Sequence, residues 1–134
     1  MARILIAEDE EAIRTLVARA LRQDGHEVLT ANDGAQALDV LAREKGAFAL
    51  LLTDIRMPVM DGIALAHAAA HRHPDVTILL MTGYADQRER AHGLDALVHD
   101  VITKPFSLGA MRRAVSDALG LAAAREPARR TVFD

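Results

Sequence analysis

The sequence has no cysteine and few aromatic residues. Its 134 residues contain no Trp, one Tyr and three Phe. The lack of cysteine excludes disulfides, thiolate catalysis and thiolate zinc sites, and the scarcity of aromatic side chains argues against a surface that stacks nucleic-acid bases. The apolar runs fall well short of the ~20 residues of a membrane span, and no basic stretch followed by an apolar run indicates a signal peptide. We therefore expect a cytoplasmic protein without a membrane partner.

The length and composition are those of one ordinary globular domain. Apolar residues make up 51% of the chain, which is enough for an apolar core and argues against disorder. Sixteen basic and 19 acidic residues give a net charge of −3. This balance argues against a dedicated nucleic-acid binder.

Short apolar runs alternate with helical patterns five times. An apolar run without polar alternation is typical of a strand that is covered on both faces. The expected strands span residues 4–7, 27–31, 48–54, 76–81 and 97–103. Five strands, each followed by a helix, predict an α/β fold with a flavodoxin-like five-stranded parallel sheet of order 2-1-3-4-5 and five helices on both faces.

Caps and apolar spacing predict where the helices lie. The first should end before Gly25 and the second should be capped by Asp33. The third spans about residues 63–71, and a polar fourth helix spans about 86–93. The last should begin after Ser107 and end at Gly120, so that residues 1–120 form the domain and residues 121–134 a flexible tail. The inward residues of the first helix should be Ile13, Leu16, Val17, Ala20 and Leu21.

Polar side chains follow four of the five apolar runs. Glu8 and Asp9 follow the first, Asp54 the third, Thr82 the fourth and Lys104 the fifth. In an open parallel sheet these strand ends meet at one edge, where ligands bind. Two carboxylates 4 Å apart repel by about 4 kcal/mol at an effective dielectric constant of 20, and Mg²⁺ is the usual cation to offset this where phosphate is also present.

A carboxylate beside Mg²⁺ and a lysine is a competent nucleophile for a phosphoryl group. Asp54 is expected at the centre of the polar side chains that follow the strands. Thr82 can supply a hydroxyl group to the acyl phosphate. The residues alone therefore predict reversible phosphorylation of Asp54, held by Lys104 and Mg²⁺.

These motifs resemble the receiver domain of two-component response regulators. The resemblance covers residues 2 to about 120 and is carried by Glu8-Asp9, by Asp54-Ile55-Arg56-Met57-Pro58-Val59-Met60-Asp61-Gly62, by Thr82 and by Lys104-Pro105-Phe106. It implies a phosphorelay protein with Asp54 as phosphoacceptor, Lys104 paired with the phosphoryl group and Thr82 as the switch hydroxyl. It also implies that the metal ligands are Asp54, Asp9, Glu8 through water, and the backbone carbonyl of Arg56. The Lys104-Pro105 peptide bond is expected to be cis.

The sequence departs from the family pattern at two positions. Receivers commonly carry an aromatic switch residue on the fifth strand three residues before the lysine, where this chain has Val101. Tyr84, two residues after Thr82, is the candidate replacement. The first acid is Glu8, where Asp is commoner.

The resemblance implies a phosphoprotein that takes its phosphoryl group from a sensor histidine kinase or a histidine phosphotransfer protein and is not a multi-turnover enzyme. Residues 2–9 and 80–84 are similar to the CpdR type of stand-alone receiver. That similarity implies an output protein, the ClpXP protease, for which the unphosphorylated form is an adaptor.

Three alternatives stay open on the sequence. The first is a phosphate sink or relay carrier without an output of its own. The second is a flavin-binding carrier, disfavoured by acids in the first loop and by scarce aromatics. The third is an aspartyl phosphatase, which usually needs a second Asp at position 56, where this chain has Arg.

Overall fold

The sheet has the predicted topology. The computed structural model describes residues 1–83 and 97–124. All strand pairs are parallel, in the order β2-β1-β3-β4-β5, so the α/β fold and strand order predicted from the sequence are confirmed. The elements are β1 (Arg3–Ala7), α1 (Glu11–Gln23), β2 (Glu27–Ala31), α2 (Gly34–Arg43), β3 (Leu50–Asp54), α3 (Gly62–Arg72), β4 (Thr77–Thr82), β5 (Asp100–Thr103) and α5 (Leu108–Ala124).

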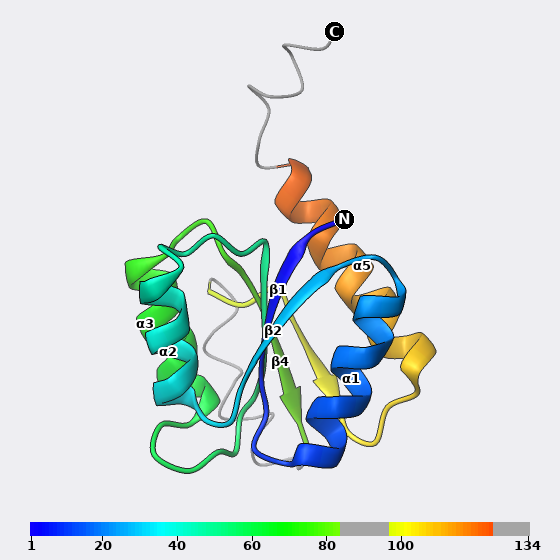
Figure 1. Cartoon of the computed structure of the whole chain (residues 1–134), viewed down its shortest axis with the longest axis horizontal. Coiled ribbons are helices and arrows are strands. Elements are labelled where there is room, and N and C mark those ends of the chain that lie inside the picture. The colour runs from blue at the N-terminus through cyan, green and yellow to red at the C-terminus, as the bar shows by residue number, and fades with distance from the viewer. Residues whose placement is uncertain (84–96, 125–134) are drawn as a thin grey trace, which may run out of the picture.

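The helices form a layer on each face of the sheet. Figure 1 shows α1 and α5 on one side and α2 and α3 on the other. Successive strand residues point to opposite faces, so Ile4 and Ile6 pack toward α1 and α5, whereas Leu5 and Ala7 pack toward α2 and α3. This double coverage explains why the central strands β1, β3 and β4 are nearly continuous apolar runs.

Capping fixes where several helices begin, as the sequence predicts. The Asp33 carboxylate accepts the Gln36 N–H at 2.8 Å at the start of α2, and the Ser107 hydroxyl accepts the Ala110 N–H at 3.0 Å in front of α5. Gly25, with φ of 93°, takes the left-handed conformation just after α1. Such a conformation suits glycine and ends a helix.

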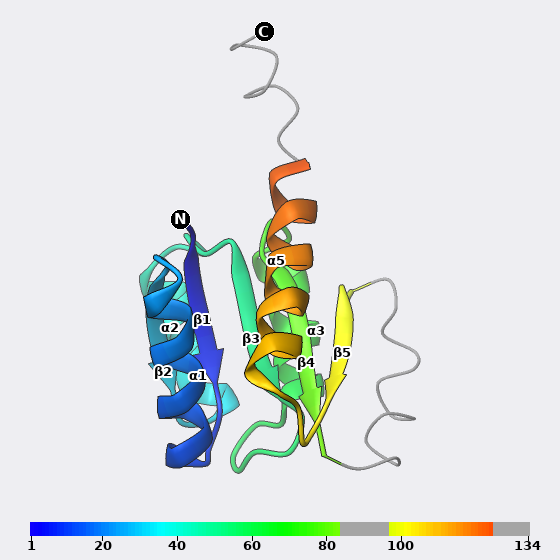
Figure 2. The ribbon, with the colours of Figure 1, turned by 90° about the vertical axis from the view of Figure 1, so that its right-hand side faces the viewer.

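The structure corrects several predicted boundaries. The last helix continues through Gly120 to Ala124, because one glycine costs only about 1 kcal/mol in a helix and the alanines after it favour helix. Figure 2 shows this helix extending beyond the sheet. Strand β3 begins at Leu50 instead of residue 48, and β5 begins at Asp100 instead of residue 97.

Two further predictions concern the helices. Leu16 is 50% exposed, so its predicted place in the core is wrong. The buried stripe of α1 is centred on Val17 and Leu21, and Leu16 lies at its edge. The expected helix over 86–93 and the remainder of the predicted tail, 125–134, lie outside the described residues, so four of the five expected helices are described. No helix within 1–83 and 97–124 is both long and apolar enough to span a bilayer.

Candidate functional site

Three acidic side chains converge at the carboxyl edge of the sheet. Glu8 and Asp9 directly follow β1, and Asp54 is the last residue of β3. Because β1 and β3 are paired neighbours in register, oxygen atoms of the three carboxylates lie within 4.8 Å of one another. Glu8 is fully buried, Asp54 is 6% exposed, and Asp9 is exposed. The predicted convergence of these acids is confirmed.

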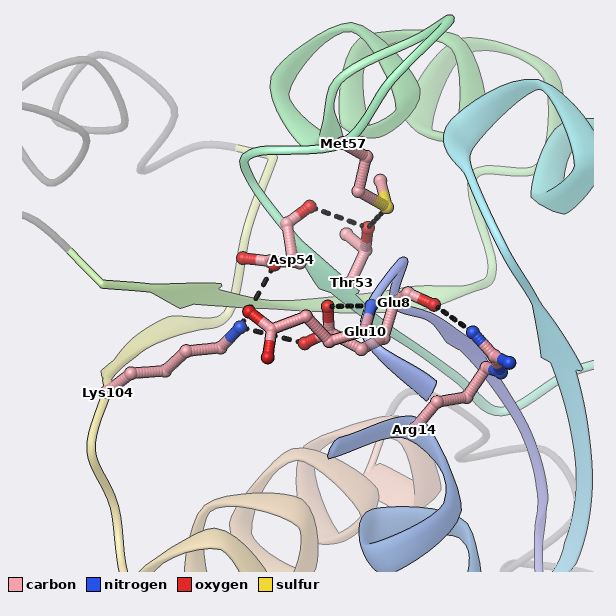
Figure 3. A network of polar contacts seen from close by, with 7 residues as sticks. All are labelled: Glu8, Glu10, Arg14, Thr53, Asp54, Met57 and Lys104. Atoms are coloured by element: carbon pink, nitrogen blue, oxygen red, sulfur yellow. Dashed lines mark hydrogen bonds and ion pairs between the residues drawn. The ribbon is translucent and has the colours of Figure 1, made fainter. Parts of the chain in front are cut away.

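Lys104 brings a positive charge to the two buried acids. Figure 3 shows its ammonium group between them: Nζ lies 2.8 Å from Glu8 Oε1 and 3.0 Å from Asp54 Oδ2. The lysine follows β5, and its backbone N–H donates to the Thr82 carbonyl at 2.6 Å. The Lys104-Pro105 peptide bond is cis, as the resemblance implies.

Burial and charge shift the protonation of this network. Burial raises the pKa of the Glu8 carboxyl from 4.5 to about 7; the hydrogen bond from Lys104 opposes that rise, and the charge of Asp54 adds to it. Burial lowers the pKa of Lys104, but its hydrogen bonds with Glu8 and Asp54 and their charges outweigh burial, so the pKa lies above its usual value. The lysine is therefore a permanent cation at neutral pH, whereas Glu8 takes up and releases a proton there.

The donor set fits a hard divalent cation. Three carboxylates face one ammonium group, which leaves an excess of negative charge. Two charges 4.8 Å apart repel by about 3 kcal/mol at an effective dielectric constant of 20. Oxygen ligands of this kind are those that Mg²⁺ prefers. Asp9 and Asp54 could bind such an ion from the solvent side, with Glu8 behind them.

The loop after β3 fixes the position of Asp54. The Ile55 N–H donates to the Met81 carbonyl at 3.0 Å, and the Gly62 N–H donates to the Ile55 carbonyl at 2.7 Å. The contact at Gly62 is so close that a Cβ there would lie 2.0 Å from the Asp54 carbonyl oxygen. The glycine is therefore required for this loop to pack behind the acceptor strand, a role that the sequence motif alone did not reveal.

A tight turn in the same loop contains an unusual residue. Val59 has φ of 69°, and across it the Met60 N–H donates to the Pro58 carbonyl at 2.8 Å. This is the pattern of a classic γ-turn, which is rare and strained. A β-branched side chain adds to the strain at positive φ, and Val59 is 85% exposed, so no packing of its side chain offsets that cost.

A cavity of about 500 Å³ opens beside the acidic cluster. Its polar wall includes Asp9, Asp54 and Lys104, together with Arg56 and Gly83. Its apolar wall is formed by Ile13, Leu16, Val17, Pro105, Phe106 and Leu108. The cavity leads from the surface to Asp54 and could admit a phosphoryl donor.

Of the other predicted residues, Thr82 and Arg56 lie close to Asp54. Thr82 is fully buried at the end of β4, one residue past the Met81 partner of Asp54. Arg56 is exposed, two residues after the acceptor. Val101 pairs with Leu80 and is partly buried, whereas Tyr84 lies outside the described residues.

Sequence reasoning missed two supports of Glu8. The Arg14 guanidinium donates to the Glu8 backbone carbonyl at 2.9 Å (Figure 3), and the Glu10 N–H donates to Glu8 Oε2 at 3.2 Å. Glu10 is also the N-cap residue of α1, and its side chain forms no cap hydrogen bond. No pattern in the sequence marks Arg14, because the contact depends on how α1 packs.

Comparison with known proteins agrees with this geometry. A family model described as "Response regulator receiver domain" matches residues 4–116. The response regulator receiver protein CpdR of Brucella abortus is 41% identical over 108 residues, which cover 81% of this chain and 88% of that protein. The response regulator MprA of Mycobacterium leprae is 37% identical over 106 residues, which cover 79% of this chain but 46% of that protein. The chain thus spans about half the length of the MprA relatives.

A solved structure shows the same architecture. The response regulator TrrA from Thermotoga maritima, in complex with Mg²⁺-BeF, aligns with a TM-score of 0.77 at 29% identity. The alignment covers 88% of this chain and 99% of that one.

Proposed function

The chain belongs to the response regulator receiver family, and from this premise we propose that it accepts a phosphoryl group on Asp54 from a phosphohistidine donor. The observation that carries the proposal is the contact of Lys104 Nζ with both Glu8 and Asp54, at 2.8 and 3.0 Å, beside the exposed carboxylate of Asp9. A phosphorylated aspartate needs compensating positive charge. Lys104 carries one such charge, and the carboxylates of Asp9 and Glu8 could hold a cation that supplies more.

The chain's own residues have distinct roles in the transfer. An Asp54 carboxylate oxygen attacks the phosphorus atom, a P–O bond forms, and the P–N bond to the donor histidine breaks with its electrons going to the imidazole. Lys104 is held by Glu8 and can follow the negative charge as it moves onto the phosphoryl oxygens. Bound Mg²⁺ would supply electrostatic stabilisation of that charge, with Asp9, Asp54, Glu8 and the Arg56 carbonyl as its ligands. Thr82 lies at the strand end where its hydroxyl can meet the phosphoryl group.

Phosphorylation would act as a switch because it adds charge to a buried site. The added charge would draw Lys104 and Thr82 toward Asp54 and so favour a different arrangement of the strand ends that carry these two residues. A cytoplasmic output protein would read that surface. The relation to CpdR favours the ClpXP protease as the output, bound by the unphosphorylated form.

The transfer step can be tested with a small P–N donor. Phosphoramidate and Mg²⁺ should add one phosphoryl group to the wild type, detected by mass spectrometry, and none to Asp54→Asn. Asp100→Asn is a matched control, because it removes one exposed carboxylate from the start of β5. An Asp54→Asn variant that is modified as fast as the wild type would overturn the proposal.

The output step can be tested by comparing the unphosphorylated protein with a mimic of the phosphorylated one. Purified ClpXP should bind the free protein and Asp54→Ala but lose affinity for beryllofluoride-treated wild type. The second candidate function is a phosphate sink or relay carrier. Fast hydrolysis of phosphorylated Asp54, together with equal ClpXP binding in all states, would favour that candidate.

A further inference from the structure

A basic groove lies on α1, away from the acidic cluster. It encloses about 480 Å³ and is lined by Arg14, Arg19 and Arg22, with Thr15, Ala18 and Thr30 between them. None of the described residues that line it is acidic. Helix α1 carries these three arginines and one acid, Glu11, whereas the chain as a whole has a net charge of −3. Positive charge is therefore concentrated on this face.

Two of the arginines are held in place by the fold. Arg14 donates to the Glu8 carbonyl at 2.9 Å, and Arg22 donates to the Val28 carbonyl of the edge strand β2, also at 2.9 Å. Each contact uses one nitrogen of the guanidinium group and leaves further donors for a ligand. Because their side chains are already ordered, less entropy is lost when they bind an anion.

Arg19 is different, because it is exposed and its side chain forms no hydrogen bond or ion pair with other residues of the described chain. It lies between the two anchored arginines along the helix. Within residues 1–83 and 97–124 no partner neutralises the Arg19 charge, so a ligand can bind this side chain without breaking a contact with those residues.

We propose that this groove, defined by Arg14, Arg19 and Arg22, docks an extended acidic segment of a partner protein. Guanidinium groups bind carboxylates through paired hydrogen bonds. Arg14 and Arg22 are eight helical residues apart, or about 12 Å along the axis. Two carboxylates four residues apart in an extended peptide are separated by about 13 Å. The groove thus matches an acidic residue at every fourth position.

A nucleic acid is the less suitable ligand. The chain's net charge is negative and its aromatic content is 3%, so neither a long-range positive field nor stacking would support binding of a polynucleotide. The proposal goes beyond phosphorylation of Asp54 and uses none of the residues assigned to that step.

The test is a titration of the isotope-labelled protein. The probe is a Gly/Ser peptide with Glu at every fourth position, and the matched peptide has Gln at those positions. Binding of the Glu peptide should shift the amide signals of α1 and β2 and weaken as salt is added. Arg19→Gln should weaken it by up to about fivefold, the effect of one exposed ion pair, while Arg72→Gln, an exposed arginine of α3, leaves it unchanged.

Several results would overturn the proposal. These are equal binding of the Gln peptide, equal loss in Arg19→Gln and Arg72→Gln, signal shifts confined to α2 and α3, or tighter binding of an oligothymidylate than of the Glu peptide. Phosphorylation of Asp54 should be normal in Arg19→Gln, so failure of this proposal and failure of the proposed function can be told apart.

Discussion

Replacing Glu8 with Gln should stabilise the metal-free protein at alkaline pH, although it alters a buried hydrogen-bonded residue. The carboxyl is fully buried, and burial raises its pKa from 4.5 to about 7. The folded protein therefore binds a proton at Glu8 more tightly than the unfolded chain does. The free energy of unfolding therefore falls as the pH rises from the pKa of Glu8 in the unfolded chain to its pKa in the folded protein. The loss is complete above about pH 7.

The magnitude follows from the size of this shift. The pKa of Glu8 rises from 4.5 to about 7, and each pKa unit corresponds to about 1.36 kcal/mol. The wild type should therefore lose about 3 kcal/mol of stability above pH 7 but less than about 1 kcal/mol near pH 5. Gln cannot ionise, but it loses the hydrogen bond that Glu8 Oε2 accepts from the Glu10 N–H, worth about 1 kcal/mol. We therefore expect the free energy of unfolding of Glu8→Gln to exceed that of the wild type by about 2 kcal/mol near pH 8 and to equal it near pH 5. Lys104 does not titrate in this window, because its pKa lies above the usual value of 10.5.

Urea denaturation followed by circular dichroism, in EDTA at both pH values, measures the difference. Glu11→Gln is the matched control, since Glu11 is an exposed acid in the first turn of α1, and it should change the free energy of unfolding by less than about 0.5 kcal/mol. Added Mg²⁺ should stabilise the wild type more than Glu8→Gln, because a ligand that binds the folded state more tightly raises the free energy of unfolding more. A Glu8→Gln variant that is less stable than the wild type near pH 8 in EDTA, or whose difference does not change with pH, would refute the reasoning.

Three further substitutions test the loop after β3 and the cap of α2, each by its midpoint of thermal unfolding. Gly62→Ala should destabilise the protein by about 2–4 kcal/mol, because the new Cβ would lie 2.0 Å from a backbone oxygen. In the control Gly109→Ala the new Cβ meets nothing closer than 3.5 Å, so this variant should not be destabilised. Equal effects of the two substitutions would contradict the predicted clash at Gly62. Val59→Asn should stabilise by about 0.5–1 kcal/mol, since Asn tolerates positive φ better, and a loss of stability would argue against strain. Asp33→Ala should cost about 1 kcal/mol by removing the cap of α2; an unchanged midpoint would show that the cap is not needed.

Local patterns were sufficient for the architecture. Both faces of the central strands β1, β3 and β4 are covered, so apolar runs such as 4–7 and 50–52 mark these strands without reference to distant residues. The connection rules for parallel strands then favour one order of the sheet. Because strand ends of a parallel sheet meet at one edge, the clustering of Glu8, Asp9, Asp54 and Lys104 could also be inferred from the sequence.

Quantities that depend on packing could not be inferred. The raised pKa of Glu8 results from its complete burial. The exposure of Leu16 results from its place at the edge of the buried stripe of α1, and the requirement for Gly62 from a contact between two backbones. The arginine groove depends on β2 passing beside α1. The sequence by itself determined which elements form and which polar groups reach one edge, because both follow from short-range periodicity. Only the tertiary structure decided burial, close approach and the shape of the surface, because each requires contacts between residues far apart in the chain.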